Sequence, residues 1–76
     1  MTADERRILR ALAWMVEQYL TDPKHGDLDS LSMSAGEGAL RVLAEHGFVT
    51  ITDAGGRCGV WTDAGRGLLD ERDEEF

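Results

Sequence analysis

The sequence predicts a small α+β domain with a three-helix core, a two-stranded β-hairpin and a short C-terminal helix. Three observations indicate this order: apolar residues recur at helical spacing in the N-terminal half, a β-branched run follows, and a threonine opens the last apolar segment. A chain of 76 residues allows one domain. Because such a domain buries only about 60% of its unfolded surface, we expect one small core and no deep catalytic cleft. The domain is expected over residues 1–69, followed by an acidic tail over residues 70–76.

The first helix is expected from about Glu5 to Leu20. Asp4 and Glu5 in its first turn favour the positive end of the helix dipole. Asp22-Pro23 ends the helix, because the residue before a proline is pushed out of the helical conformation. The apolar residues have the spacings of three and four that are typical of an amphipathic helix; they are Ile8, Leu9, Leu12, Val16, Tyr19 and Leu20.

Two further helices are expected after this stop. The second is short and is capped by Asp27 or Asp29. Its apolar residues are Leu28, Leu31 and Met33. Ser34 and Glu37 have the spacing of a capping box, so the third helix is expected to begin near Ala35. The residues on or near one face of this helix are Ala39, Leu40, Val42, Leu43 and His46.

A β-hairpin is expected after the third helix. Gly47 can adopt the left-handed conformation that ends a helix. The β-branched and aromatic run 48–52 predicts a strand, residues 53–56 have turn composition, and residues 57–62 predict the return strand. Trp61 in the return strand is expected to pack on the helices and anchor the hairpin.

A final short helix follows the hairpin. Thr62 can cap it, and Leu68 and Leu69 supply its apolar side. Gly65 and Gly67 weaken the helix by about 1 kcal/mol each relative to alanine.

With these elements the chain resembles the winged helix-turn-helix superfamily of small bacterial, archaeal and phage domains. The segment LRVLAEHGFVTI is similar to a recognition helix that enters the first wing strand, and VWTDAGRGLL is similar to a return strand that enters a closing helix. The resemblance implies DNA-contact positions on the third helix and the wing, namely Ser34, Gly36, Glu37, Gly38, Arg41, Glu45 and Arg57.

The charge of the chain is poorly suited to DNA, because 8 Lys and Arg stand against 15 Asp and Glu, for a net charge of -7. Affinity for DNA comes largely from Lys and Arg that neutralise phosphates. Arg41 could reach a guanine, but Glu37 and Glu45 lie at the i-4 and i+4 spacings of helix-surface ion pairs. A DNA-binding regulator would therefore act as a dimer that doubles the candidate contacts, which are Lys24, Ser34, Gly36, Arg41, Arg57 and Arg66.

Trp14 has two interpretations. On a helical wheel it falls opposite the stripe of Ile8, Leu12 and Val16. An outward Trp beside arginine suits a protein interface, or a homodimer built by the first helix; alternatively, Trp14 covers the hairpin or the final helix and belongs to the core. The residues of the predicted interface are Arg7, Arg10, Trp14, Glu17 and Gln18.

No enzyme, metal site or cofactor is expected. His25, His46 and Cys58 are the soft metal-ligand candidates, and they lack any C-x-x-C or H-x-x-x-H spacing. A single cysteine makes no intramolecular disulfide, which suits a reducing compartment. No apolar run approaches the roughly 18 residues of a membrane span, and the N-terminus lacks the apolar core of a secretory signal, so a cytoplasmic location is expected.

Protein binding is the function we expect first. In its most specific form, an acidic surface imitates the phosphates of nucleic acid and occupies a basic channel of a nucleic-acid-handling complex, as small acidic phage inhibitors such as anti-CRISPR proteins do. The residues concerned are Asp27, Asp29, Glu37, Glu45, Asp70, Glu71, Asp73, Glu74 and Glu75. The expected partner is a protein with a basic surface or a second copy of the chain, not a membrane. The alternatives are the DNA-binding regulator and a structural docking module of a larger assembly.

Overall fold

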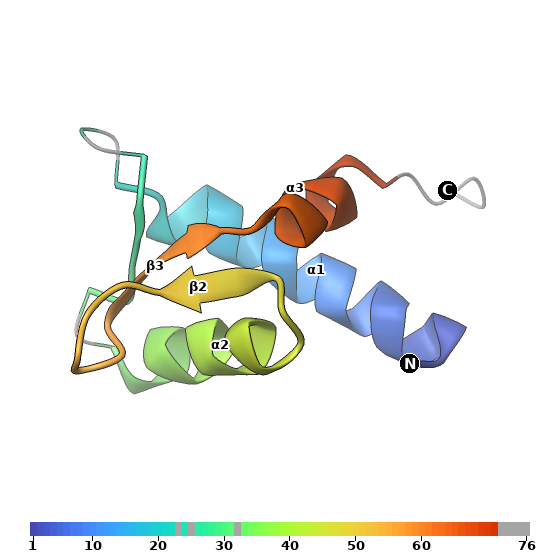
Figure 1. The fold of residues 1–76 in the computed structure, drawn as a ribbon, viewed down its shortest axis with the longest axis horizontal. Coiled ribbons are helices and arrows are strands. Elements are labelled where there is room, and N and C mark those ends of the chain that lie inside the picture. Colours follow the sequence, from blue (N-terminus) through green and yellow to red (C-terminus); the bar gives the residue numbers. More distant parts are fainter. Residues whose placement is uncertain (23, 25, 32, 72–76) are drawn as a thin grey trace.

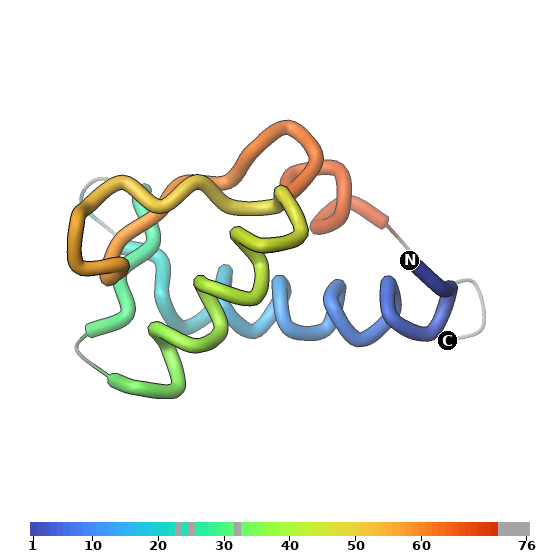
Figure 2. Tube along the Cα trace, turned by 60° about the horizontal axis from the view of Figure 1, so that its bottom comes forward, coloured from blue at the N-terminus to red at the C-terminus, as the bar shows by residue number. Residues whose placement is uncertain are grey.

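The computed structural model describes residues 1–22, 24, 26–31 and 33–71, and the fold over these residues is α+β, as the sequence predicts. The three strands in these residues form an antiparallel sheet in the order β1-β3-β2. Figure 2 shows the β2-β3 hairpin above α2, and α3 above α1. The elements in chain order are α1 (Ala3–Leu20), β1 (Leu28–Asp29), α2 (Ser34–Glu45), β2 (Val49–Ile51), β3 (Cys58–Trp61) and α3 (Asp63–Asp70) (Figure 1).

Helix α1 starts at Ala3, earlier than expected, because Thr2 and Glu5 form a capping box that the sequence analysis missed. Thr2 Oγ1 accepts a hydrogen bond from Glu5 N at 3.0 Å, and Glu5 Oε1 accepts one from Thr2 N at 3.3 Å. The helix ends at Leu20, as expected. Its apolar core face consists of Leu9, Ala13, Val16 and Leu20.

The prediction of a short second helix is wrong. Leu28 and Asp29 instead form β1, in which Leu28 lies opposite Gly59 of β3. Asp29 caps no helix, since its Oδ1 accepts a hydrogen bond from Leu31 N at 2.9 Å, in a turn where Leu31 has a φ of +57°. The extended conformation is favoured because the edge of β3 offers backbone partners and Leu28 becomes fully buried.

The prediction of a capping box at Ser34 and Glu37 is also wrong. Met33 is the N-cap of α2, with no side-chain cap hydrogen bond, and Ser34 is the first helical residue. The other end of the helix confirms the prediction, because Gly47 has a φ of +80° and Phe48 N donates to a carbonyl of the last turn.

The hairpin and the closing helix form as the sequence predicts. In the hairpin, Val49 pairs with Trp61, and Ile51 pairs with Gly59. Thr62 Oγ1 accepts a hydrogen bond from Gly65 N at 3.0 Å and donates one to the Gly47 carbonyl at 2.6 Å, so one hydroxyl joins the start of α3 to the end of α2. The buried core contains Leu9, Ala13, Val16, Leu20, Leu28, Ala39, Leu40, Leu43, Phe48, Val49, Trp61 and Leu68.

Candidate binding surfaces

Trp14 packs against α3, which confirms the interpretation that it covers the final helix. Its Nε1 donates a hydrogen bond to the Leu69 carbonyl at 2.9 Å, and the guanidinium of Arg10 lies over its ring at 5.6 Å from the centroid. Trp14 is half-buried and Arg10 is buried. Both residues are therefore occupied by contacts inside the domain. In the predicted interface, this leaves Arg7, Glu17 and Gln18 as the exposed members.

Glu17 also has an internal role. Its Oε2 accepts a hydrogen bond from Trp61 Nε1 at 2.6 Å, which fixes the indole of β3 against α1. Trp61 belongs to the buried core, so the expectation that it anchors the hairpin on the helices is confirmed.

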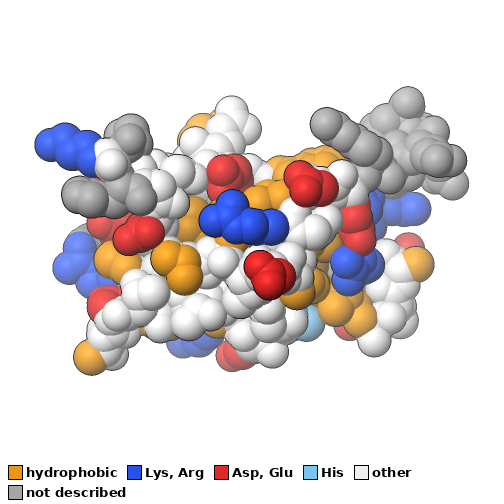
Figure 3. Space-filling model, turned by 45° about the horizontal axis from the view of Figure 1, so that its top comes forward, with side chains coloured by type: hydrophobic (Ala, Val, Ile, Leu, Met, Phe, Trp, Pro, Cys, Tyr) orange, Lys and Arg blue, Asp and Glu red, His pale blue; other side chains and the backbone are white. Residues whose placement is uncertain are grey.

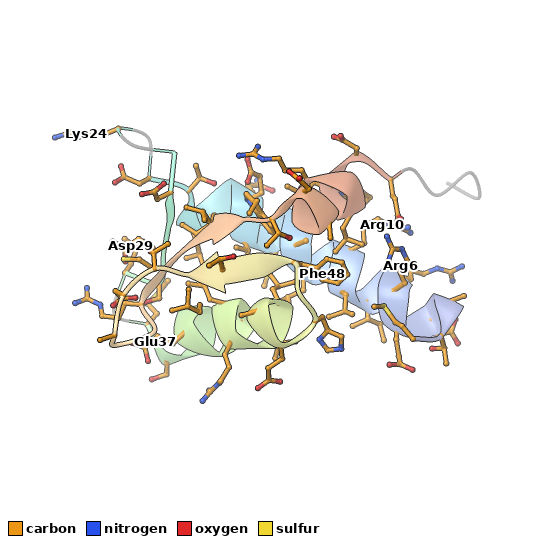
Figure 4. All side chains as sticks on the ribbon, viewed as in Figure 1. Arg6, Arg10, Lys24, Asp29, Glu37 and Phe48 are labelled. Carbon is orange, nitrogen blue, oxygen red and sulfur yellow. The ribbon has the colours of Figure 1, made fainter. Side chains whose placement is uncertain are left out.

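Glu71, expected in a solvated tail, is tied to α1. Its Oε1 accepts from Arg6 Nε at 2.7 Å, and its Oε2 accepts from Arg10 Nη1 at 3.3 Å. Figure 4 shows Arg6 and Arg10 on α1, close to the end of α3, with Phe48 beside them. Residues 70 and 71, beyond the boundary expected at residue 69, thus belong to the fold, because α3 continues to Asp70 and Glu71 contacts α1. Asp73, Glu74 and Glu75 lie outside the described residues.

Replacing Glu71 with glutamine should lower the melting temperature at neutral pH. The expected loss in the free energy of unfolding is about 1 kcal/mol, which is the upper end of the range for ion pairs that are partly exposed to water. The hydrogen bond from Arg6 is the main cause that lowers the pKa of Glu71 below its ordinary value of 4.5. A lowered carboxyl pKa stabilises the fold above the unfolded-state pKa, and this contribution is lost as the pH falls through the folded-state pKa. Thermal melts from neutral to strongly acidic pH should therefore show a difference that shrinks in acid. Asp70→Asn, on an exposed side chain next to Glu71, is the control; a difference that is the same at every pH would contradict the ion pair.

The concave surface between α2 and the hairpin is the region that the resemblance assigns to DNA. A hollow of about 270 Å³ is lined by Glu37, Arg41, Ile51, Gly55 and Gly56. In the described part of the chain no ion pair joins Arg41 to either glutamate of α2, so the helix-surface pairs expected from the spacing do not form. The side chains that line this hollow include one cation, Arg41, and one carboxylate, Glu37.

The hairpin tip adds a carboxylate to this surface. Asp53 Oδ1 accepts hydrogen bonds from Arg57 N and Cys58 N, both at 2.8 Å. These bonds, the one from Cys58 first, lower the pKa of Asp53. The exposed Arg57 side chain therefore shares the tip with a carboxylate that remains ionised, which weakens attraction to phosphate.

The other predicted DNA contacts do not gather on one face. Gly36 is buried, and a Cβ there would lie 2.9 Å from the Ser30 carbonyl oxygen, so this position is a packing contact. Lys24 projects away from the body of the domain in Figure 4, and Arg66 is exposed on α3. Ser34 is exposed at the start of α2. On the face drawn in Figure 3, acidic and basic side chains alternate with hydrophobic ones.

An apolar groove between α1 and α2 is the surface that the sequence analysis missed. It encloses about 160 Å³. Three large side chains on it are largely exposed: Met15 is 50% exposed, Tyr19 67% and Met33 49%. The groove is lined by Met15, Val16, Tyr19, Leu20, Met33, Ala35, Gly36 and Ala39.

The apolar surface extends beyond the groove at both ends. At one end, Ile8 is 69% exposed and lines a hollow of about 170 Å³ with Glu5, Leu9 and His46. At the other end a hollow of about 430 Å³ shares Tyr19 and Leu20 with the groove and also contains Thr21, Asp22, Asp29 and Leu31. Each of these two hollows contains carboxylates, namely Glu5 in the first and Asp22 and Asp29 in the second.

The sequence contained a signal for this surface. The spacing groups Ile8, Val16 and Tyr19 as apolar residues of one amphipathic helix, yet the apolar positions of α1 cover a wider arc than one core face. In the structure this arc is divided between the buried core face of α1 and an exposed stripe beside it. The exposed stripe consists of Ile8, Met15 and Tyr19. Likewise, Val42 on α2 and His46 at its C-cap are exposed, whereas Leu40 and Leu43 are fully buried.

Metal binding finds no support in the described residues. No group of three His, Cys, Asp or Glu side chains could hold an ion there. His46 stacks on Phe48 at 6.4 Å between centroids, and Cys58 is a half-buried free thiol. His25 lies outside the described residues. A search of the described helices finds none that is long and apolar enough to cross a membrane.

A comparison of the chain with protein-family models, curated proteins and solved structures found no match.

Proposed function

We propose that the chain is a protein-binding domain and that it binds through the groove between α1 and α2. The observation that carries this proposal is the exposure of Met15, Tyr19 and Met33 around one apolar hollow. A cluster of exposed large apolar side chains on a small domain is costly in water and typically marks a binding surface. Methionine suits such a surface, because its flexible side chain adapts to a partner.

We further propose that the fold is a winged-helix variant. The order α1-β1-α2-β2-β3-α3 and the pairing of β1 with β3 support this assignment, with α2 in the place of the recognition helix and the β2-β3 hairpin as the wing. The variant differs from the expected helix-turn-helix in one respect. The described residues between β1 and α2 form a turn, so the helix that would precede α2 is absent from them.

Recognition by the groove is favoured over mimicry of nucleic acid because the acidic candidates among the described residues belong to several different elements. Asp29 lies on β1, Glu37 and Glu45 on α2, and Asp70 at the end of α3. Glu71 is held in ion pairs with Arg6 and Arg10. A phosphate mimic needs its carboxylates on one surface, whereas the groove already brings its apolar residues together.

Photo-crosslinking can test the proposal in extracts of the source cells. With p-benzoylphenylalanine at Tyr19 of the full chain, we expect a discrete protein adduct; the same crosslinker at Arg66, exposed on α3, should give none. Met33→Asp should reduce the Tyr19 adduct about tenfold, which corresponds to about 1.4 kcal/mol of binding free energy. Equal adducts at Tyr19 and Arg66, or none at either, would overturn protein binding through this groove.

The DNA-binding alternative has its own measurement. Fluorescence anisotropy with labelled random duplex DNA should show no salt-sensitive binding by the full chain or by a chain ending at Leu69. Salt-sensitive binding that Arg41→Ala and Arg57→Ala each weaken would instead favour the dimeric regulator.

A further inference from the structure

The exposed stripe of α1 carries a projecting side chain at one end and an apolar hollow at the other. The groove takes its α1 residues from the segment between Met15 and Leu20. Ile8, which is largely exposed, lies about 10 Å or more from this segment, at about 1.5 Å per residue along the helix. Figure 2 shows α2 beside the C-terminal half of α1, with the N-terminal half extending beyond it. The projection and the hollow are therefore separate features of one surface.

The groove is large enough to take an isoleucine side chain. It encloses about 160 Å³. An apolar cavity of about 150 Å³ holds a benzene molecule, which has more carbon atoms than the side chain of isoleucine. On the α2 side the groove is lined by the small residues Ala35, Gly36 and Ala39. Ile8 cannot reach the groove of its own chain, because both belong to the same rigid helix, but it could enter the groove of another copy.

A two-fold axis near Leu12 would bring the projections and hollows of two copies together. In a two-fold contact, a residue that touches a second residue of the other copy is also met by it in return. Leu12 lies about midway between Ile8 and the groove segment of α1. An axis there would place Ile8 of each copy opposite the segment between Met15 and Tyr19 of the other. The two helices would be antiparallel, and both grooves would be filled.

The spacing along α1 suits such a helix pair. Ile8, Leu12, Met15 and Tyr19 follow one another at intervals of four, three and four residues, the repeat by which packed helices interdigitate. Leu12 is only partly buried by its own chain. Ala11 beside the stripe is small and exposed, so it leaves room for Met15 of the other copy.

The contacting side of α1 is uncharged over the length of the stripe. Between Ile8 and Tyr19, the residues that a helical wheel places within about 90° of the stripe are Ala11, Leu12, Met15, Val16 and Gln18. Like charges therefore do not meet inside the contact. The net charge of -7 on each copy acts at longer range, where salt screens it over a Debye length of about 8 Å at physiological ionic strength.

The exposed apolar area is that of a weak dimer. With about 200 Å² for a fully exposed large side chain, Ile8, Met15, Tyr19 and Met33 together expose about 450 Å². Standard interfaces bury about 800 Å² on each partner, and those of weak, transient complexes bury less than about 600 Å². The stripe and the groove therefore match a reversible contact, with a dissociation constant in the micromolar range or weaker.

We propose that a second copy of the chain occupies the groove, in an antiparallel two-fold contact in which Ile8 of each copy enters the groove of the other. Trp14 takes no part in this contact, because its indole packs on α3. This inference rests on the proposed function, because it names the partner of the same groove.

Disulfide trapping tests the geometry of the contact. Cys58, the single cysteine, is first replaced in the full chain by Cys58→Ser, so that each added cysteine is the only thiol. A mixture of Ile8→Cys and Tyr19→Cys chains should form mainly the mixed disulfide, identified by its intact mass. Each variant alone should link poorly, because two cysteines whose Cα atoms are more than about 7 Å apart cannot be bridged without backbone movement. Ala64→Cys, exposed on α3, is the control and should link to neither.

Sedimentation velocity measures the strength of the contact. We expect the purified chain to dimerise reversibly, and more strongly when salt is raised from about 50 mM to about 500 mM, because salt screens the repulsion between the copies. Ile8→Asp should weaken the dimer about tenfold or more, as loss of a central apolar contact does. Ala64→Asp makes the same change in net charge at an exposed position and should weaken it much less. Thermal melts check that both variants stay folded.

Three outcomes would overturn the inference. The first is a chain that stays monomeric up to about 1 mM, a concentration at which even a weak specific dimer forms. The second is an Ile8→Cys chain that links to itself as readily as to Tyr19→Cys. The third is equal weakening by Ile8→Asp and Ala64→Asp, which would place the contact elsewhere. The crosslinking at Tyr19 in extracts separates this inference from the proposed function: an adduct with a different protein would retain binding through the groove, even where the purified chain is monomeric.

Discussion

Replacing Gly65 with alanine should destabilise the domain by about 3 kcal/mol or more, a cost in the range of severe overpacking. A Cβ at this position would overlap with the Phe48 carbonyl oxygen and lie 2.9 Å from Trp61 Cε3. Neither neighbour can move freely. The Phe48 carbonyl accepts a hydrogen bond from Thr62 N at 3.0 Å, and the indole of Trp61 is held by Glu17. Urea unfolding, followed by the helical circular dichroism signal, measures the change in the free energy of unfolding.

Gly67→Ala is the matched control on the same helix. A Cβ at Gly67 would meet nothing within 4 Å, so alanine there should stabilise the domain by up to about 1 kcal/mol through its higher helix propensity. The two substitutions should therefore have opposite signs. If Gly65→Ala also stabilised the fold, the close approach of α3 to the hairpin would be contradicted.

The two glycines illustrate what the sequence can and cannot predict. Helix propensity is a property of one residue in its own helix, so the sequence analysis assigned Gly65 and Gly67 the same cost. The two positions differ because the Phe48 carbonyl, which is distant in sequence, lies against Gly65 in the folded domain. Signals that act within a few residues were predicted correctly at Gly47, at the turn before β3 and at the Thr62 cap. Local signals were not always sufficient, because the capping box of Thr2 and Glu5 was missed and the one expected at Ser34 and Glu37 does not form.

The binding surface was harder to predict because amphipathicity fixes only which arc of a helix is apolar. The wheel of α1 indicated its apolar side but not how much of it the rest of the domain would cover. Helix α2 covers Val16 and leaves Tyr19 exposed, and α3 covers Trp14, which the wheel placed on the outside. Both outcomes depend on where α2 and α3 pack, and this information is spread over the whole chain.

A net charge of -7 spread over a surface disfavours DNA, but it identifies no partner. The groove is the more specific feature, because Met15, Tyr19 and Met33 expose large apolar side chains around one hollow. In the proposed function these three side chains would supply most of the affinity for a partner protein.

Leu28→Ala should cost about 2–5 kcal/mol of the free energy of unfolding, as is usual for a large-to-small change in a packed core. Leu28 is fully buried although it belongs to a strand of only two residues, β1. Its backbone pairs with Gly59 and with Thr21, so the side chain is fixed between α1 and β3 and little relaxation can fill the space it leaves.

Leu31→Ala is the control, and it separates the strand from the helix that the sequence predicted. In an amphipathic helix, Leu28 and Leu31 would be three positions apart on the same buried face, and both substitutions would be costly. In the structure Leu31 is 60% exposed and its φ of +57° is equally unfavourable for leucine and alanine. Leu31→Ala should therefore change the free energy of unfolding by less than about 0.5 kcal/mol. Similar losses of the free energy of unfolding for Leu28→Ala and Leu31→Ala would support the short helix that the sequence predicted. A loss confined to Leu28→Ala would instead support β1 as the third strand of the sheet.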